Sequence, residues 1–178
     1  NLTWNEILED LQSELNKTSQ KNYRILSSKN PSCGAFKMEI RVWDRDAESI
    51  QDITELYSMK RSAYKSALRA YKGLSVYRDG VLVLPKSEAS RDWIGLDLRR
   101  VGRVGDRIST NQIIGIIEIS SSYNPQIKDA TDREKLVDTI EYLEFTTIIK
   151  AAVKLLEGLR KSDRIETDNH SVEGSRTL

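Results

Sequence analysis

The sequence predicts an α+β fold in which a mixed β-sheet carries its helices mainly on one face. Three observations lead to this prediction. Residues 35–43 alternate apolar and polar side chains, as a half-buried strand does. Residues 112–119 are short, apolar and rich in isoleucine, which favours a second strand. Residues 132–161 repeat apolar side chains at helical spacing, which predicts a long helix against the sheet.

The N-terminal part of the chain predicts a helix, a strand and a second helix in turn. Residues 3–27 place apolar side chains, Trp4 among them, at helical spacing. Residues 30–34 contain proline and glycine and form a break before the strand of 35–43. Residues 48–71 then return to helical spacing.

The middle of the chain predicts a hairpin. Residues 74–77 and 81–84 are apolar strands on either side of Asp79-Gly80, the residue pair expected in a tight hairpin turn. The isoleucine-rich strand of 112–119 follows later, and we expect it to be buried on much of both faces.

The chain is long enough for one domain with its own core, since it has 178 residues. We expect a single domain over residues 1–161, in which residues 1–30 form a helical lead-in. Residues 162–178 are polar and lack a core pattern, which predicts a disordered tail. The chain starts at Asn1, within a segment that is already predicted to be helical, so we interpret it as a piece of a longer polypeptide.

The composition excludes several classes of site. With 28 basic and 27 acidic residues, the net charge of +1 gives no global argument for binding nucleic acid or a membrane. No apolar run approaches the ~20 residues of a membrane span, and no secretory signal is visible, so we expect a cytoplasmic protein. Cys33 is the only cysteine and His170 the only histidine. Intrachain disulfides are therefore excluded, and histidine triads or metal clusters have almost no support.

The first candidate site is a basic, glycine-containing segment over residues 99–107. Its four arginines are Arg99, Arg100, Arg103 and Arg107. Such a segment is suited to gripping the phosphates of a nucleotide or a nucleic acid. The plain alternative is a solvated loop whose arginines pair with acidic residues such as Asp92 and Asp97. The segment does not match the standard glycine-rich phosphate-binding motifs.

The second candidate site lies at the predicted start of the last helix. Thr131 and Glu134 have the spacing of a capping box. This spacing places Arg133 in the first helical turn, beside unpaired amide donors and the positive end of the helix dipole. A guanidinium in that position suits a phosphate. The plain alternative is that Arg133 pairs with a nearby carboxylate. Both arginine-bearing segments follow apolar strands, which allows them to converge on one anion.

Several motifs follow one another between residues 73 and 140. They are GLSVYRDG at 73–80, VLP at 83–85, DWIGLD at 92–97, STNQIIG at 109–115 and TDRE at 131–134. In this order they resemble the transducer region of the GHKL ATPases, the superfamily of gyrase B, MutL, the HtpG-type chaperones and the MORC proteins. Bacterial GHKL proteins of unassigned role look most similar, followed by the HtpG-type middle domain. The resemblance is weaker over 35–72 and absent from the tail.

The resemblance implies a β-α-β transducer fold of the ribosomal-protein domain-2-like type. In these families an N-terminal domain binds ATP and Mg²⁺, and the transducer follows it. An arginine in a Ser-Arg-Glu turn of the HtpG-type middle domain reaches the γ-phosphate, and Arg133 matches that arginine. The resemblance thus implies that Arg133 contacts the γ-phosphate as an arginine finger does. We expect Thr131 and the 99–107 segment to add further nucleotide contacts.

The sequence departs from the family pattern at three places. Lys135 stands where glycine is expected, Leu82 where arginine is common, and Lys86-Ser87 where Tyr-Gly is usual. For the catalytic lysine of the gyrase B and MutL transducers, only Lys128 and Lys135 are candidates.

The resemblance also implies partners. The family's ATP-binding motifs, Glu-x-x-x-Asn and Asp-x-Gly-x-Gly, are not found in this sequence, so we do not expect this chain alone to hydrolyse ATP. ATP and Mg²⁺ would be bound by the protein's own N-terminal ATPase domain, in a homodimer whose role is chaperone-like or DNA-processing. Two other functions stay open. One is a nucleic-acid-binding module that uses the 99–107 segment and depends steeply on salt. The other is a plain protein-interaction domain.

Overall fold

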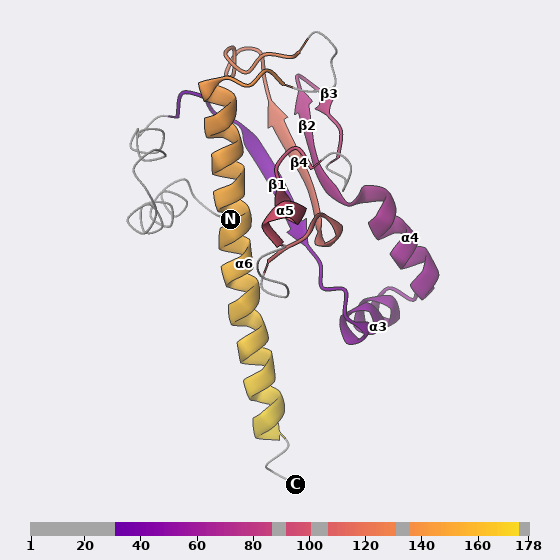
Figure 1. Cartoon of the computed structure of the whole chain (residues 1–178). Helices are drawn as coiled ribbons and strands as arrows, with labels where there is room; N and C mark the ends of the chain where they lie inside the picture. The colour runs from indigo at the N-terminus through magenta and orange to yellow at the C-terminus, as the bar shows by residue number, and fades with distance from the viewer. Residues whose placement is uncertain (1–30, 87–91, 101–106, 131–135, 175–178) are drawn as a thin grey trace.

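The computed structural model describes residues 31–86, 92–100, 107–130 and 136–174. These residues form a mixed sheet of four strands in the order β1-β4-β2-β3, with the long helix α6 lying across one face (Figure 1). The strands are β1 (Lys37–Val42), β2 (Gly73–Arg78), β3 (Val81–Leu84) and β4 (Ile113–Ile119). The helices are α3 (Ala47–Leu56), α4 (Arg61–Tyr71), α5 (Leu96–Arg100) and α6 (Ile140–Gly174), with the 3₁₀ helix η1 at Thr110–Gln112. The predicted α+β class with a mixed sheet is confirmed.

The four strands form one sheet with both parallel and antiparallel pairs. β4 pairs antiparallel with β1 and parallel with β2, and β2 pairs antiparallel with β3. Asp79 and Gly80, which join β2 to β3, both have positive φ, at 48° and 81°. Two successive positive φ values are typical of the tight turn whose twist matches that of a hairpin. The predicted hairpin is therefore confirmed.

β4 is buried on one face and not on both. Every second residue from Ile113 to Ile119 is buried against α6, whereas Ile116 on the opposite face is 49% exposed. Ile114 is covered because it packs against the cluster that α3 and α4 form. The expectation of burial on much of both faces is wrong, because isoleucines on both faces hide the alternation in the sequence.

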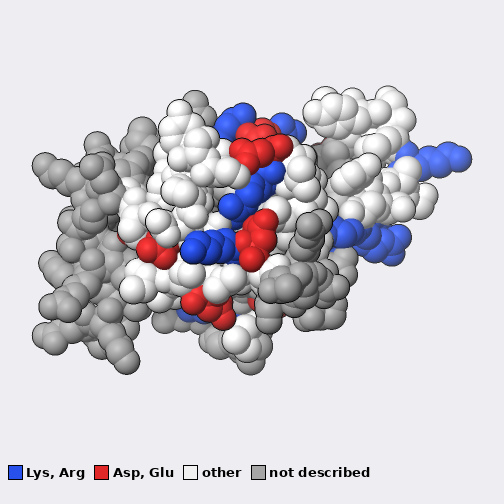
Figure 2. All heavy atoms as spheres, turned by 90° about the horizontal axis from the view of Figure 1, so that it is seen from above, with Lys and Arg blue, Asp and Glu red and all other residues white. Residues whose placement is uncertain are grey.

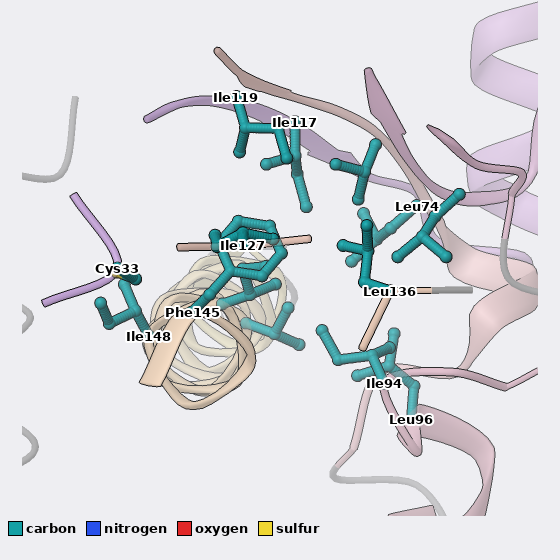
Figure 3. Close-up of a cluster of buried hydrophobic side chains, with 14 of the residues drawn as sticks. Cys33, Leu74, Ile94, Leu96, Ile117, Ile119, Ile127, Leu136, Phe145 and Ile148 are labelled. Carbon is teal, nitrogen blue, oxygen red and sulfur yellow. The ribbon is translucent and has the colours of Figure 1, made fainter. Parts of the chain in front are cut away.

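The main core lies between α6 and the sheet. Figure 3 shows Phe145 and Ile148 of α6 within this cluster, together with strand and loop residues. The Phe145 ring meets the Phe36 ring edge-on, with centroids 4.9 Å apart. Completely or almost completely buried members of the core include Leu74, Val76, Ile94, Leu96, Ile108, Ile117, Ile127, Leu136, Ile149 and Val153.

The segment that the sequence predicts as one helix over 48–71 is two helices. α3 ends at Leu56, and Ser58 then takes a positive φ of 48°, which interrupts the helix. Ile50 of α3 and Tyr64 of α4 pack into one small cluster against the sheet. The apolar spacing runs on through the break because both helices bury residues in the same cluster. The predicted helix over 3–27 lies outside the described residues.

α6 begins later than the sequence predicts. Its first residue is Ile140, and the Thr139 hydroxyl accepts a hydrogen bond from the Tyr142 N–H at 3.1 Å, as an N-cap does. Leu136 is not helical but forms a β-bridge with Asp129. The predicted start near residue 132 is wrong because a threonine cap at 139 defines the helix, and a capping-box pattern earlier in the sequence does not.

α6 also ends later than predicted. It continues to Gly174, past the end near residue 161 that the sequence predicts. Asp44, just after β1, accepts hydrogen bonds from Arg160 and Arg164, the latter at 2.7 Å. The hydrophobic pattern misses this part because its two large apolar residues, Ile165 and Val172, do not form an apolar stripe. Among the described residues, no helix is both long and apolar enough to cross a membrane.

A substitution at Gly115 in β4 tests how tightly the sheet is packed. A Cβ at this position would lie 2.5 Å from a methyl carbon of Leu74 and 3.0 Å from the Glu39 carbonyl oxygen. We expect Gly115→Ala to lower the free energy of unfolding by about 1–3 kcal/mol, because the core must shift to admit one methyl group. Chemical denaturation measures this change.

Gly158 of α6 provides the matched control, since a Cβ there would meet no atom within 4 Å apart from its chain neighbours and its own helix backbone. Gly158→Ala should raise the free energy of unfolding by about 0.5–1 kcal/mol, because alanine loses less backbone entropy in a helix. Equal effects of the two substitutions would contradict the packing described for β4.

Candidate functional site

The predicted site residues fall into two groups. Arg99 and Arg107 have described side chains, and Arg100 is described only in its backbone, at the end of α5. Arg103, Thr131 and Arg133 lie outside the described residues. The residues on either side of each undescribed stretch are nevertheless described: they end at 100 and resume at 107 for the first segment, and they end at 130 and resume at 136 for the second.

The ends of the 99–107 segment are fastened to α6 by Glu157. One guanidinium nitrogen of Arg99 donates to both carboxylate oxygens of Glu157, at 2.8 and 2.9 Å. The same carboxylate accepts the Ile108 N–H at 3.0 Å. Arg107 in turn donates to the Arg99 carbonyl oxygen. Glu157 is only 11% exposed, so the pair is largely withdrawn from water.

The acidic partners proposed from the sequence have other roles. Asp92 accepts the N–H groups of Leu96 and Asp97, both at 2.9 Å, and so caps α5. The Asp97 carboxylate accepts the Thr110 N–H at 2.9 Å. The described contacts of Arg99 and Arg107 are with Glu157 and with the Arg99 carbonyl, not with Asp92 or Asp97. The side chains of Arg100 and Arg103 lie outside the described residues. Arg99 finds its carboxylate on α6, nearly sixty residues away in the sequence.

Lys150 completes a cluster of mixed charge between α5 and α6. Burial lowers the pKa of the Lys150 amine, the Arg99 guanidinium lowers it further, and the Asp92 carboxylate acts in the opposite direction. In Figure 2 the basic and acidic side chains of the described residues intermingle on the visible face and do not form a continuous basic surface. The described contacts of Arg99 and Arg107 thus favour a structural role over a grip on nucleic acid.

The chain is also held on both sides of the segment that contains Arg133. Asp129 and Leu136 form an antiparallel β-bridge, and the Val137 N–H donates to the Lys128 carbonyl at 2.8 Å. These contacts bring the entry and the exit of the segment side by side. Because α6 begins at Ile140, Arg133 does not belong to its first turn. The predicted contribution of that helix dipole to Arg133 is therefore wrong.

Arg78, at the end of β2, supports this base. Its guanidinium donates to the Ile127 carbonyl and lies 3.2 Å from a carboxylate oxygen of Asp129. Its side chain is 14% exposed. Sequence reasoning missed Arg78, although a signal was present. Arg78 shares its strand face with Leu74 and Val76, so period-two alternation turns an arginine toward the core.

The neighbouring turn residue holds the chain that follows β4. The Asp79 carboxylate accepts hydrogen bonds from the Ser121 hydroxyl at 2.6 Å and from the Ser121 N–H at 3.1 Å. These two bonds, the hydroxyl contributing more, lower the pKa of the Asp79 carboxyl. The β2–β3 hairpin thus contacts the segment between β4 and α6 at two successive residues.

The two candidate segments do not share one site at their bases. Glu157, beside the first base, lies seventeen residues along α6 from Ile140, beside the second. At ~1.5 Å per residue this spacing corresponds to about 25 Å. Figure 1 shows the start of α6 at one end of the sheet and α5 toward the other. The residues that hold the two segments therefore lie far apart along α6. Residues 101–106 and 131–135 lie outside the described residues, so the convergence of the segments themselves stays a prediction.

Cys33 is buried and inert. Its side chain is 1% exposed, and its N–H donates to the Glu144 carboxylate of α6 at 2.8 Å. The Ser32 hydroxyl donates to the same carboxylate at 2.6 Å. Burial first, and the Glu144 charge second, raise the pKa of the Cys33 thiol to about 12. A thiol that stays protonated at neutral pH does not act as a nucleophile.

Across the described ranges, no group of three or more His, Cys, Asp or Glu side chains is placed to hold a metal ion. No protein-family model matches the chain, and no curated protein or solved structure was found to match it. The functional assignment consequently rests on the motif resemblance and on the contacts described above.

Glu157 allows a test of the α6 connection. Glu157→Gln removes the negative charge that faces Arg99, and it replaces one carboxylate oxygen with an amide group that cannot accept a hydrogen bond. The free energy of unfolding should therefore fall by about 1–3 kcal/mol. Glu118→Gln is the matched control, because its pair with Lys37 at 3.3 Å is exposed on both sides. This control should change stability by less than about 0.5 kcal/mol. Equal changes in the two denaturation midpoints would contradict the role of Glu157.

Cys33 allows a test of burial. We expect iodoacetamide at pH 8 to modify the folded chain roughly 100-fold or more slowly than the denatured chain, because the thiolate is the reactive form. Mass spectrometry follows the reaction. Since the folded-state pKa is raised from 9.0 to about 12, the protonated thiol favours the folded state. This contribution is complete below pH 9 and is lost as the pH rises toward 12. Similar alkylation rates would contradict the buried position.

Proposed function

We propose that this chain is the transducer domain of a GHKL-type ATPase, in which Arg133 contacts the γ-phosphate of ATP. The nucleotide and Mg²⁺ are held by the N-terminal ATPase domain of the longer protein, since the family's ATP-binding motifs are not found in this sequence. The order of motifs over residues 73–140 supports the assignment. The single observation that carries it is the fixed base of the segment containing Arg133.

A γ-phosphate contact requires an arginine whose point of attachment is fixed. A misplacement of about 1 Å near a reacting group costs of the order of 100-fold in rate. The bridge between Asp129 and Leu136 ties both ends of the segment together, and Leu136 is only 3% exposed within the main core. Such a base supports a side chain that must meet a ligand on another domain.

The proposed contribution of this chain is electrostatic. Negative charge develops on the transferring phosphoryl group, and a guanidinium placed there stabilises the transition state. Because the contact depends on the γ-phosphate, ATP and ADP bias the position of this domain relative to the ATPase domain differently. The longer protein acts as a homodimer in this proposal, and its role is chaperone-like or DNA-processing.

The 99–107 segment is not part of the proposed nucleotide site. Arg99 is paired with Glu157, and the base of the segment stands about 25 Å along α6 from the base that supports Arg133. The described contacts likewise give no specific support to a nucleic-acid-binding module. We therefore keep one functional proposal.

The test is ATP turnover by the longer protein with Arg133→Ala. We expect kcat to fall by about 10³-fold, the contribution typical of an arginine finger. Arg41→Ala is the matched control, because Arg41 is 67% exposed and forms its ion pair with Glu39 of its own strand. Unchanged turnover in a folded Arg133→Ala protein would overturn the proposed function.

A further inference from the structure

We propose that the pocket between the end of β1 and the middle of α6 binds a small carboxylic acid with an apolar chain. The apolar wall of the pocket takes the chain, and two arginines of α6 take the carboxylate. This inference goes beyond the proposed function, because it uses residues that have no part in the nucleotide contact. The residues that line the pocket all lie within the described part of the chain.

The pocket forms where α6 runs on past the end of the sheet (Figure 1). β1 ends at Val42, whereas α6 continues to Gly174. The volume of the pocket is about 350 Å³, within the range of roughly 300–1,000 Å³ that is usual for small-molecule sites. A pocket of this size suits a small molecule. Its lining residues are Val42, Asp44, Leu156, Leu159 and Arg160.

One wall of the pocket is apolar and is only partly covered by the protein. Val42 and Leu156 are partly buried and pack against the main core. Leu159, almost one turn further along α6, is 53% exposed. The pocket therefore leaves leucine surface in contact with water. An apolar chain that covers this surface removes it from water, which is favourable.

Beside the apolar wall, two guanidinium groups share one carboxylate oxygen. Oδ1 of Asp44 accepts the Arg160 Nε–H at 2.7 Å, a second bond from Arg160, and a bond from Arg164 at 2.7 Å. Asp46 also interacts electrostatically with Arg164, but its carboxylate accepts the N–H and the hydroxyl of Ser49, both at 2.8 Å, at the cap of α3. Like charges one turn apart on a helix repel each other. A second anion would therefore be favourable at this place.

Arg160 keeps hydrogen-bond donors for that second anion. Its Nε and Nη2 both bond to Asp44, whereas its Nη1 has no acceptor among the described residues. The Arg160 side chain is only 14% exposed and lines the pocket. A guanidinium matches a carboxylate in shape, and hydrogen bonds between two charged groups are stronger than neutral ones. The free edge of Arg160 is thus suited to a carboxylate that enters the pocket.

The order of these groups along α6 matches an acid with an apolar chain. Leu156 and Leu159 come first, followed by Arg160 and then Arg164. Arg164 is eight residues beyond Leu156, which corresponds to about 12 Å along the helix axis. An acid whose chain lies over the leucines therefore has its carboxylate at the arginines. An alcohol with the same chain meets the same apolar wall but cannot pair with the two cations.

The first experiment titrates this chain with octanoate and, separately, with octanol, and follows the methyl signals of Leu156 and Leu159 by NMR. We expect octanoate to saturate with a Kd of the order of 1 mM or below, as an efficient ligand of this size does. Octanol should bind about tenfold more weakly, because it makes no charge-assisted hydrogen bonds. If the pocket is only a water-filled crevice, octanoate does not saturate. That result, or equal affinities of the two probes, would overturn the inference.

The second experiment fills the pocket. Leu159→Trp adds bulk to the apolar wall and should weaken octanoate binding by about tenfold or more. Leu143→Trp is the matched control, because Leu143 belongs to the same helix and is 49% exposed but does not line the pocket. Both positions are about half exposed, so we expect both variants to fold, which circular dichroism checks. Equal octanoate affinities of the two variants would place the bound acid elsewhere and overturn the inference.

The third experiment removes one of the two cations. Arg164 is 48% exposed, and Arg164→Ala leaves the Arg160–Asp44 pair in place. We expect this variant to bind octanoate about tenfold more weakly and octanol with unchanged affinity. Arg41→Ala, which removes an exposed arginine outside the pocket, should change neither affinity. Octanoate binding that is the same in both variants contradicts the role of the arginine pair.

Discussion

The described fold depends on the packing of α6 across the sheet, because α6 also supplies two carboxylates that hold separate loops, one buried and one largely buried. Glu144 accepts from Ser32 and Cys33 and thereby fixes the chain that leads into β1. Glu157 accepts from Arg99 and Ile108 and fixes both ends of the basic segment before β4. A carboxylate buried in this way is costly unless its hydrogen bonds are complete. The helix therefore specifies the arrangement of the loops as well as covering the core.

The strands could be predicted from the sequence because their signals are local. Alternation predicts β1, and the Asp79-Gly80 pair predicts the hairpin, whose residues have the required positive φ values. The helix boundaries were less predictable. Ser58 interrupts a continuous apolar pattern through its backbone conformation, and the polar end of α6 has no apolar stripe to reveal it. Both errors arise because hydrophobic spacing does not mark the limit of the element: it continues past Ser58, and it stops before α6 ends.

At the candidate site, too, the sequence predicts features that depend on neighbouring residues but not contacts between residues far apart in the chain. Local spacing selects Arg133 as a candidate, but the true N-cap of α6 is Thr139, which is known only from the packed helix. No local pattern pairs Arg99 with Glu157, because the two residues are 58 positions apart and meet only in the fold. Arg78 was predictable in principle, since strand alternation places it on the face of Val76. Its contact with Asp129 again requires the fold.

The central claim is that residue 133 lies at the γ-phosphate of ATP bound to the neighbouring domain. Cys33 is buried and its pKa is raised to about 12, so Arg133→Cys would add a thiol that reacts without competition from Cys33. The most direct measurement is labelling of that thiol in the longer protein by an ATP analogue with a thiol-reactive group on its γ-phosphate. The account predicts stoichiometric labelling that excess ATP prevents. Labelling that ATP does not prevent, or labelling no faster than at an exposed control position such as Arg41→Cys, would contradict it.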